Sequence, residues 1–212
     1  MKTKIAFLLA LFSACGFSCS NYLDEKVVSG ISFGFYDTRE GVEAGIVSVY
    51  SVMRWAYNGE RLHPIQELGT DTYQEGQDGN LKGALNRYES SLNSQLGVLY
   101  DFWSNYYTGI SRANIMIGAI PALTDMPEDL KNVRIGEARF LRGLFYFYLV
   151  QTFGKIPLVT GLEFEVKTDF KRAPVAEVYN FIIADLRDAI DKLPSEQPDY
   201  GRATKGAAQH AL

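Results

Sequence analysis

Three carboxylates in the first third of the chain are the residues closest in type and spacing to catalytic groups. Glu67, Asp71 and Glu75 follow one another at four-residue steps. Glycoside hydrolysis needs two carboxyl groups at a defined separation, one as acid and the other as nucleophile or base. Acidic residues at this spacing also occur freely on solvated turns, and we favour that interpretation. A catalytic pair remains the alternative.

The same region carries side chains that could bind a ligand without reacting with it. Aromatic rings offer flat apolar faces on which a ligand can stack. A long polar connection, residues 60–92, is expected between the first two helices. Four aromatic residues lie at or within it: Trp55, Tyr57, Tyr73 and Tyr88. Asp71 and Arg87 add ionised groups that can form hydrogen bonds with hydroxyls. Because binding residues are often carried by loops on a rigid scaffold, we expect ligand contacts in this connection.

Metal, nucleotide and nucleic-acid chemistry lack the residue patterns that they need. His63 and His210 are the only histidines, and no mature thiol lies near them in the sequence, so neither a metal site nor a Cys–His nucleophile is indicated. No glycine-rich phosphate loop follows a predicted strand. The formal charge is −4, and no cluster of Lys and Arg stands out. We therefore expect no cofactor, no metal and no nucleic-acid partner.

The N-terminus has the composition of an export signal. Lys2 and Lys4 precede an apolar core, residues 5–12, which is too short to span a bilayer. The only cysteines, Cys15 and Cys19, both lie at the end of this leader, and each follows a small residue, as in lipoprotein processing. Cys15 has the better local lipobox. In either case no cysteine pair is left for a disulfide in the mature domain.

The remainder of the chain predicts an all-α protein. Apolar residues recur at three- and four-residue steps in four stretches, each bounded by helix start and stop signals. The stretches are residues 37–57, 94–120, 125–153 and 174–193. Short turns would make neighbouring helices antiparallel, as in tetratricopeptide repeats. Long irregular insertions between them remove any fixed 34-residue period.

Several residues mark where these helices are expected to begin and end. Asp37 and Asp125 each precede a glutamate by three residues, which is the spacing of a capping box. Ser94 is the expected cap of the second helix. Gly154 is the expected C-cap of the third, and Pro157 prevents the helix from resuming. Beyond it we expect an extended, strand-like segment.

The helix predicted from residue 125 to 153 should lie in the middle of the protein, because it has two apolar faces. One face consists of Ile135, Ala138, Leu141, Phe145 and Leu149, and the other of Phe140, Leu144 and Phe147. Two such faces require two neighbours. Gly143 would let one of those neighbours approach closely. By the same spacing, Trp103, Tyr106 and Tyr107 are expected to pack in the core rather than to bind ligand.

Three blocks in and after this helix carry a family resemblance. They are Glu137-Ala138-Arg139-Phe140-Leu141-Arg142-Gly143, Phe145-Tyr146-Phe147-Tyr148 and Phe153-Gly154-Lys155-Ile156-Pro157-Leu158-Val159. These blocks resemble the signature helix of the SusD-like (RagB/SusD) family of glycan-binding surface lipoproteins. Residues 201–208 resemble a later block, after which that family continues for several hundred residues. We therefore expect a truncated chain whose last helix, residues 204–212, lacks a packing partner.

The resemblance also implies a domain organisation and a set of partners. Residues 19–24 resemble the start of mature SusD-like proteins, so Cys19 is expected to carry the lipid. This gives a signal peptide over residues 1–18, a tether and extended lead-in over 19–36, and the N-terminal part of a helical domain over 37–212. The implied partners are a glycan, the outer membrane through the lipid, and a SusC-like TonB-dependent transporter.

The ligand-binding residues follow in part from the same resemblance. Residues 68–71 resemble the start of a loop that contributes to the family's glycan site. The resemblance assigns binding first to Asp71 and then to Tyr73, with Arg87 and Tyr88 after them, and Trp55 joins them from its place beside the polar connection.

Three classes of function remain open. The first, which the resemblance implies, is a non-catalytic lipoprotein that binds glycan at the cell surface and hands it to an outer-membrane transporter. The second is a secreted helical glycoside hydrolase. The third is a tetratricopeptide-like scaffold that binds a protein segment in its concave face.

Overall fold

Four long helices form the frame of the protein, and they are arranged around α5 (Glu128–Phe153). The computed structural model describes residues 33–58, 61–76, 82–161 and 169–212, and residues from Gly34 onward form one compact unit. In chain order the elements are η2 (Phe33–Asp37), α2 (Arg39–Tyr57), α3 (His63–Glu67), η3 (Lys82–Asn86), α4 (Gly97–Ala119), η4 (Ile120–Ala122), α5, β1 (Ile156–Pro157), β2 (Arg172–Ala173), α6 (Val175–Lys192) and α7 (Lys205–Ala211).

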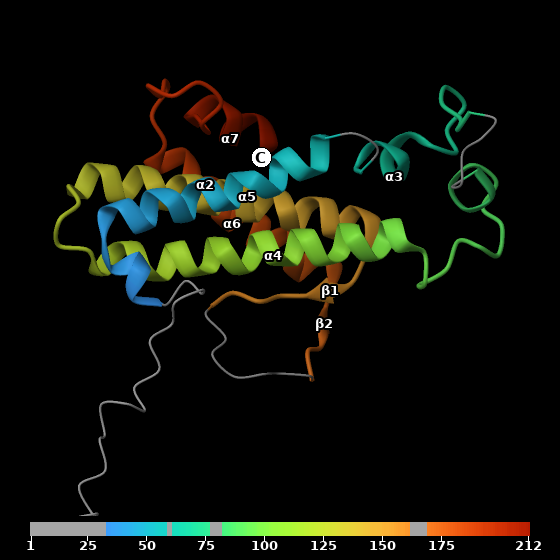
Figure 1. Ribbon diagram of the computed structural model, residues 1–212, viewed down its shortest axis with the longest axis horizontal. Helices are drawn as coiled ribbons and strands as arrows, with labels where there is room; N and C mark the ends of the chain where they lie inside the picture. The colour runs from blue at the N-terminus through green and yellow to red at the C-terminus, as the bar shows by residue number, and fades with distance from the viewer. Residues whose placement is uncertain (1–32, 59–60, 77–81, 162–168) are drawn as a thin grey trace, which may run out of the picture. The chain divides into compact units, whose positions relative to one another are not determined.

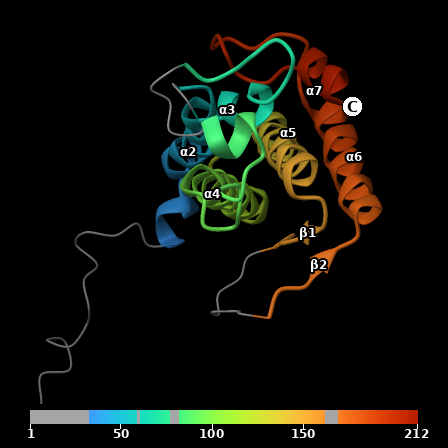
Figure 2. The ribbon, with the colours of Figure 1, turned by 90° about the vertical axis from the view of Figure 1, so that its right-hand side faces the viewer.

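The four long helices run alternately in opposite directions (Figure 1). Helix α4 packs between α2 and α5, and α6 packs on another side of α5. Viewed along the helices, α2, α4, α5 and α6 follow one another around the frame (Figure 2). The prediction of an all-α fold built from antiparallel helix pairs with long irregular insertions is therefore confirmed.

The core contains most of the aromatic rings that the spacing placed there. Tyr106 and Phe145 are fully buried, and their ring centroids lie 5.5 Å apart. Trp103 and Tyr107 are half-buried and pack against the same core, as predicted. Phe147 differs from the prediction because its side chain is 36% exposed. The second apolar face of α5 is thus only partly covered in the described residues.

Two glycines allow close packing around α5. A Cβ on Gly143 would touch Leu186 of α6 at 3.4 Å, so the predicted close approach of a neighbour at Gly143 is confirmed. A Cβ on Gly109 of α4 would lie 2.6 Å from the ring of Phe145. A side chain at Gly109 would clash with the Phe145 ring, whereas a Cβ at Gly143 would make an ordinary van der Waals contact with Leu186.

The helix starts were predicted less well than the helices. Thr38, not Asp37, caps α2, and its hydroxyl accepts a hydrogen bond from the N–H of Gly41 at 3.1 Å. Helix α5 begins after Pro127 without a side-chain cap, because Asp125 accepts a hydrogen bond from the N–H of Arg39 instead, at 3.2 Å. The expected capping box at Asp125 is therefore wrong.

The remaining boundary signals had mixed outcomes. Ser94 does not cap α4, whose N-cap is Leu96 without a side-chain hydrogen bond. Pro174 is the N-cap of α6 rather than its first residue. Gly154 ends α5 with φ +69°, in the left-handed region, so this C-cap prediction is confirmed. The extended segment that follows is also confirmed, since β1 pairs with β2 in antiparallel register, Ile156 opposite Ala173.

The last helix has a packing partner, contrary to our expectation. Ala208 of α7 is fully buried in a small cluster with Ala189 of α6 and Leu193, the residue that follows α6. Thr204 caps α7 and accepts a hydrogen bond from the N–H of Ala207 at 3.3 Å. The alanine spacing correctly indicated a helix. The sequence did not indicate that this helix would pack against α6.

The predicted signal peptide, the cysteine expected to carry the lipid (Cys19) and most of the predicted tether lie outside the described residues. At the end of that stretch the structure has a 3-10 helix, η2, where an extended lead-in was expected. In the described part of the chain, every helix is too short or too polar to cross a membrane.

Candidate functional site

A buried carboxylate fixes the frame on which the candidate site rests. Glu137 of α5 is fully buried, yet it accepts hydrogen bonds from Arg134 at 3.1 Å, from Arg202 at 3.0 Å and from the hydroxyl of Tyr50 at 2.9 Å. Glu43 of α2 accepts from the same two arginines, at 2.8 and 3.2 Å. This Glu137 cluster joins α2, α5 and the segment before α7.

The surroundings of Tyr50 in the Glu137 cluster keep its phenol protonated. Burial raises the pKa of Tyr50, and the charge of Glu137 raises the pKa further. The hydroxyl therefore remains a donor to Glu137 while it accepts a hydrogen bond from the N–H of Ala203 at 2.8 Å. Because each buried charge has several partners, the cluster avoids the large cost of an unpaired buried ion.

A second buried pair joins α5 to α6 and α4. Arg142 donates to both carboxylate oxygens of Asp185 at 2.7 Å and to the amide oxygen of Asn114 at 2.6 Å. Burial raises the pKa of Asp185, and the hydrogen bonds from Arg142 oppose that shift. The amide of Asn114 in turn donates to the carbonyl of Val159 at 2.8 Å, which anchors the segment after β1.

The connection between α2 and α4 lies at the end of the frame where α2 and α5 finish and α4 begins (Figure 1). It contains α3, which starts at His63 with Pro64 in its first turn. Tyr73 lies edge-on against the ring of His63, with 5.2 Å between centroids, and remains 51% exposed. Thr70 accepts a hydrogen bond from the N–H of Tyr73 at 3.3 Å. The exposed Tyr73 ring is thus held in place.

Gly69 and Tyr88 bring the two halves of this connection together. The hydroxyl of Tyr88 donates to the carbonyl of Gly69 at 3.3 Å. Gly69 has φ +81°, and a Cβ there would meet the carbonyl oxygen of Leu85 and lie 2.5 Å from the Tyr88 hydroxyl. Tyr88 itself has φ +53°, the left-handed region that a bulky residue rarely adopts. Such backbone strain is found most often at functional sites.

The structure therefore brings together some of the predicted binding residues but not all of them. Asp71 is exposed and lies two residues before Tyr73 in the chain. Arg87 is half-exposed, and its guanidinium is paired with Glu89 at 2.6 Å. Trp55 is half-buried against the core, and the guanidinium of Arg61 lies 5.9 Å from its ring centroid. No described contact joins Trp55 to the other four.

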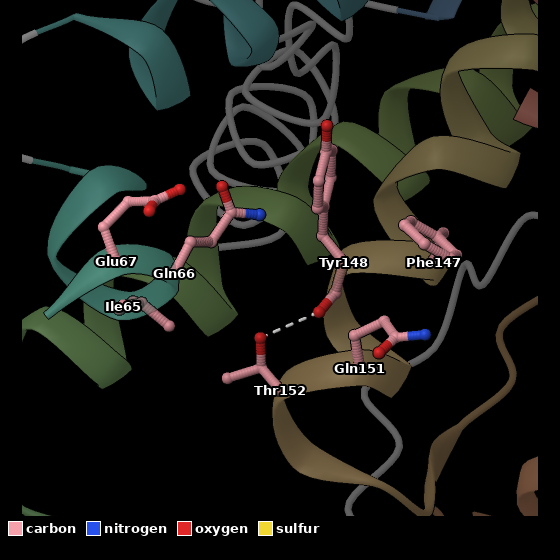
Figure 3. A pocket seen from close by; sticks show the side chains of 7 residues that line it. All are labelled: Ile65, Gln66, Glu67, Phe147, Tyr148, Gln151 and Thr152. Atoms are coloured by element: carbon pink, nitrogen blue, oxygen red, sulfur yellow. Dashed lines mark hydrogen bonds between the residues drawn. The ribbon is translucent and has the colours of Figure 1, made fainter. Parts of the chain in front are cut away.

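An open groove lies beside this connection, between α3 and the last turns of α5. Its volume is about 650 Å³. The lining residues are Ile65, Gln66, Glu67, Phe147, Tyr148, Gln151 and Thr152. Figure 3 shows Gln66 and Glu67 on one wall and Tyr148 and Thr152 on the other, with Thr152 donating a hydrogen bond to the carbonyl of Tyr148 at 2.9 Å.

The sequence did not reveal this groove. Phe147 was placed inside the core by its spacing, and Glu67 was considered only as an acidic group. Gln66 and Gln151 gave no signal in the sequence, because they line one groove only in the folded chain. The sequence analysis also did not predict that Glu137 and Arg142 are buried and join neighbouring elements. Their position inside a largely apolar helix could have indicated it.

Metal binding finds no support in the part of the chain that the structure covers. No three His, Cys, Asp or Glu side chains come together there in a way that would hold an ion.

Comparison with known proteins places this helical frame in a family of carbohydrate-associated proteins. Residues 21–212 match the SusD-like family model described as starch-binding and associating with the outer membrane. A SusD-like protein of Bacteroides ovatus is 31% identical over the whole of this chain and 38% of its own length. The chain belongs to the SusD-like family.

Solved structures agree with this assignment. A laminarin-binding SusD-like protein superposes with a TM-score of 0.72 at 31% identity, over 81% of this chain and 38% of its own. A protein crystallised with a xylogluco-oligosaccharide gives a TM-score of 0.62 at 26% identity, over 79% of this chain and 32% of its own. The chain thus spans well under half the length of the relatives that it matches.

Proposed function

We propose that this protein is a lipid-anchored, surface-exposed outer-membrane protein that binds glycan without cleaving it and delivers it to a SusC-like TonB-dependent transporter. The observation that supports this most strongly is the shared frame with a laminarin-binding relative, in a family described as starch-binding and associated with the outer membrane. The xylogluco-oligosaccharide complex of a second relative points to the same class of ligand.

The surface formed by residues 69–73 and 88 has the chemistry that such a ligand needs. A sugar exposes apolar C–H faces and hydroxyl edges, so its site needs rings and fixed polar groups. Tyr73 and Tyr88 supply exposed rings, each held by a contact to a neighbouring segment. Asp71 supplies an ionised acceptor that makes no side-chain hydrogen bond within the described residues, so its oxygens are available to hydroxyls.

Calorimetric titration of the full-length protein with laminarin and xyloglucan oligosaccharides tests the proposal. We expect Asp71→Ala to weaken binding by about 10-fold or more, because a hydrogen bond to a charged group is lost. Tyr73→Ala should weaken binding through loss of a stacking ring. Tyr200→Ala is the matched control, because Tyr200 is a fully exposed ring in the segment between α6 and α7.

The outcomes separate binding from stability and from catalysis. Trp103→Ala should lower the melting temperature instead of removing the site, because Trp103 packs against the core. If Asp71→Ala and Tyr73→Ala both bind like the parent protein, the site lies elsewhere. A reducing-sugar assay that detected release from these oligosaccharides would favour the glycoside hydrolase alternative.

Membrane attachment through Cys19 has a separate test. Cys19→Ala should move the protein from the membrane fraction to the soluble fraction of cells, whereas Cys15→Ala should not. The reverse result would assign the lipid to Cys15.

A further inference from the structure

The groove between α3 and α5 offers hydrogen-bonding groups that the fold does not use. The side chains of Gln66 and Glu67 make no hydrogen bond within the described part of the chain. On the opposite wall, the amide nitrogen of Gln151 donates to the hydroxyl of Tyr179 at 2.5 Å, which leaves its oxygen free to accept. Thr152 uses its proton for the Tyr148 carbonyl and keeps its lone pairs. Both walls can therefore bind hydroxyl groups.

The groove also has an apolar surface on which the C–H face of a sugar could pack. Phe147 is the residue of the Phe145–Tyr148 run that remains exposed, and its ring lies 5.8 Å from that of Tyr148. Ile65 adds an aliphatic side chain from α3. A volume of about 650 Å³ lies within the usual range of small-molecule sites, about 300–1,000 Å³. Ring, aliphatic group and free amides together fit the mixed surface of a sugar.

A buried hydroxyl lies behind the groove. Tyr106 is fully buried, and its hydroxyl makes no hydrogen bond with any residue that the structure describes. Its ring lies 5.6 Å from that of Tyr148, which lines the groove, and the hydroxyls of Tyr148 and Tyr57 lie 2.7 Å apart. Burial raises the pKa of Tyr106, and the neighbouring phenols of Tyr148 and Tyr57 raise it further. Because the Tyr106 hydroxyl is buried and Tyr106 does not line the groove, Tyr106 packs behind Tyr148 and does not itself bind the sugar.

The charge of the groove selects among sugars. Glu67 is the only ionised residue among the seven that line it, and none of the seven is Lys, Arg or His. A carboxylated or sulfated sugar would meet a like charge without a compensating cation. A neutral sugar has no such penalty.

We propose that this groove is a second binding site, separate from the Asp71 and Tyr73 surface, which takes a neutral sugar residue of the glycan and disfavours an acidic one. The proposal rests on the proposed function only in that the ligand is a glycan. Gln66 and Phe147 bind the sugar, and Glu67 excludes acidic ones.

Titration of the full-length protein with laminarihexaose and with an oligogalacturonide of equal length tests this. We expect Gln66→Ala and Phe147→Ala each to weaken laminarihexaose binding by about 3- to 10-fold, the usual effect of losing one neutral contact. Neither should shift the melting temperature much, because Gln66 has no partner in the described residues and Phe147 is partly exposed. Glu67→Gln should strengthen oligogalacturonide binding and leave laminarihexaose binding within twofold. Gln95→Ala, in an exposed stretch before α4, is the control.

The two proposals fail in different ways. If Gln66→Ala and Phe147→Ala bind laminarihexaose within twofold of the parent while Asp71→Ala weakens binding, the groove is not a site and the proposed function stands. If the groove variants weaken binding and Asp71→Ala and Tyr73→Ala do not, the groove is the site and the loop assignment is wrong. A parent protein that binds neither oligosaccharide contradicts both proposals.

Discussion

The helical frame and the connection between α2 and α4 use charged residues in opposite ways. In the frame, Glu137 and Arg142 are buried, and each is bonded to several partners from other elements. In the connection, Asp71 is exposed, and Arg87 has one partner, Glu89, on the surface. Buried charges with many partners fix a geometry, whereas exposed charges with few partners cost little stability and can bind a ligand. The contrast is the one expected if the frame sets the architecture and the connection binds the ligand, as proposed above.

The contrast is tested most severely by removing the central carboxylate of the frame. Glu137→Ala would remove one of the two carboxylates that Arg134 and Arg202 share, together with the acceptor of the Tyr50 hydroxyl, and we expect a loss of about 3 kcal/mol in the free energy of unfolding. Chemical denaturation measures it. The control is Glu128→Ala on the same helix, where a mostly exposed carboxylate pairs with Lys131 at 3.5 Å and contributes little. Equal losses for the two variants would contradict the special role of Glu137.

A second test compares two phenylalanines of α5 that are two residues apart. Phe145 is fully buried and Phe147 is 36% exposed. Phe145→Ala should cost about 3 kcal/mol of unfolding free energy, because it leaves a cavity against α4. Phe147→Ala should cost much less. Thermal melts of both variants measure the two losses of stability. A larger loss for Phe147→Ala than for Phe145→Ala would mean that the face of α5 that carries Phe147 is covered.

A smaller effect is expected at the helix caps, where sequence and structure disagree. Thr204→Ala removes the cap of α7 and should cost about 1 kcal/mol. Ser94→Ala should be close to neutral, because Ser94 is exposed and caps nothing. Urea titration followed by circular dichroism would detect the difference. A marked loss for Ser94→Ala would restore the cap that the sequence suggested.

The smallest effect on stability is expected in the connection itself. Tyr88→Gly relieves a left-handed conformation that costs on the order of 1 kcal/mol. The greater freedom of glycine in the unfolded chain costs about 0.5–1 kcal/mol, so the two effects nearly cancel. The melting temperature should therefore change little while glycan binding weakens. A large drop in melting temperature would show that Tyr88 belongs to the frame.

The sequence predicted the frame well because its signals are local. The apolar spacing of α5, the glycine at its C-cap and the extended segment after it all follow from neighbouring residues. A cap depends on which residue has the right backbone geometry, and a shift of one or two residues changes it. For this reason the caps expected at Asp37 and Asp125 were wrong, with Thr38 and Pro127 as the actual N-caps. Local spacing also misplaced Phe147, because it cannot show which part of a face a neighbour covers.

The candidate site was predictable only in part, because its pieces meet through tertiary packing. Asp71 and Tyr73 share one short segment, so their nearness in the chain could be anticipated from it. The contact of Tyr88 with Gly69 depends on a left-handed backbone that the sequence does not reveal. The groove lies between α3 and the end of α5, so Gln66 and Gln151 line it together only in the folded chain.

The Glu137 cluster also sets an order of events during folding. Its most distant pair, Glu43 and Arg202, is separated by 159 positions. A ribosome makes α2 long before Arg202, so any packing of α2 on α5 before that point would leave Glu137 and Glu43 without one of their two arginines. Contacts at such separation form late, because the loop that they close is costly in entropy. Arg202, in the segment before α7, therefore completes the charge balance of the frame and joins that segment to α2.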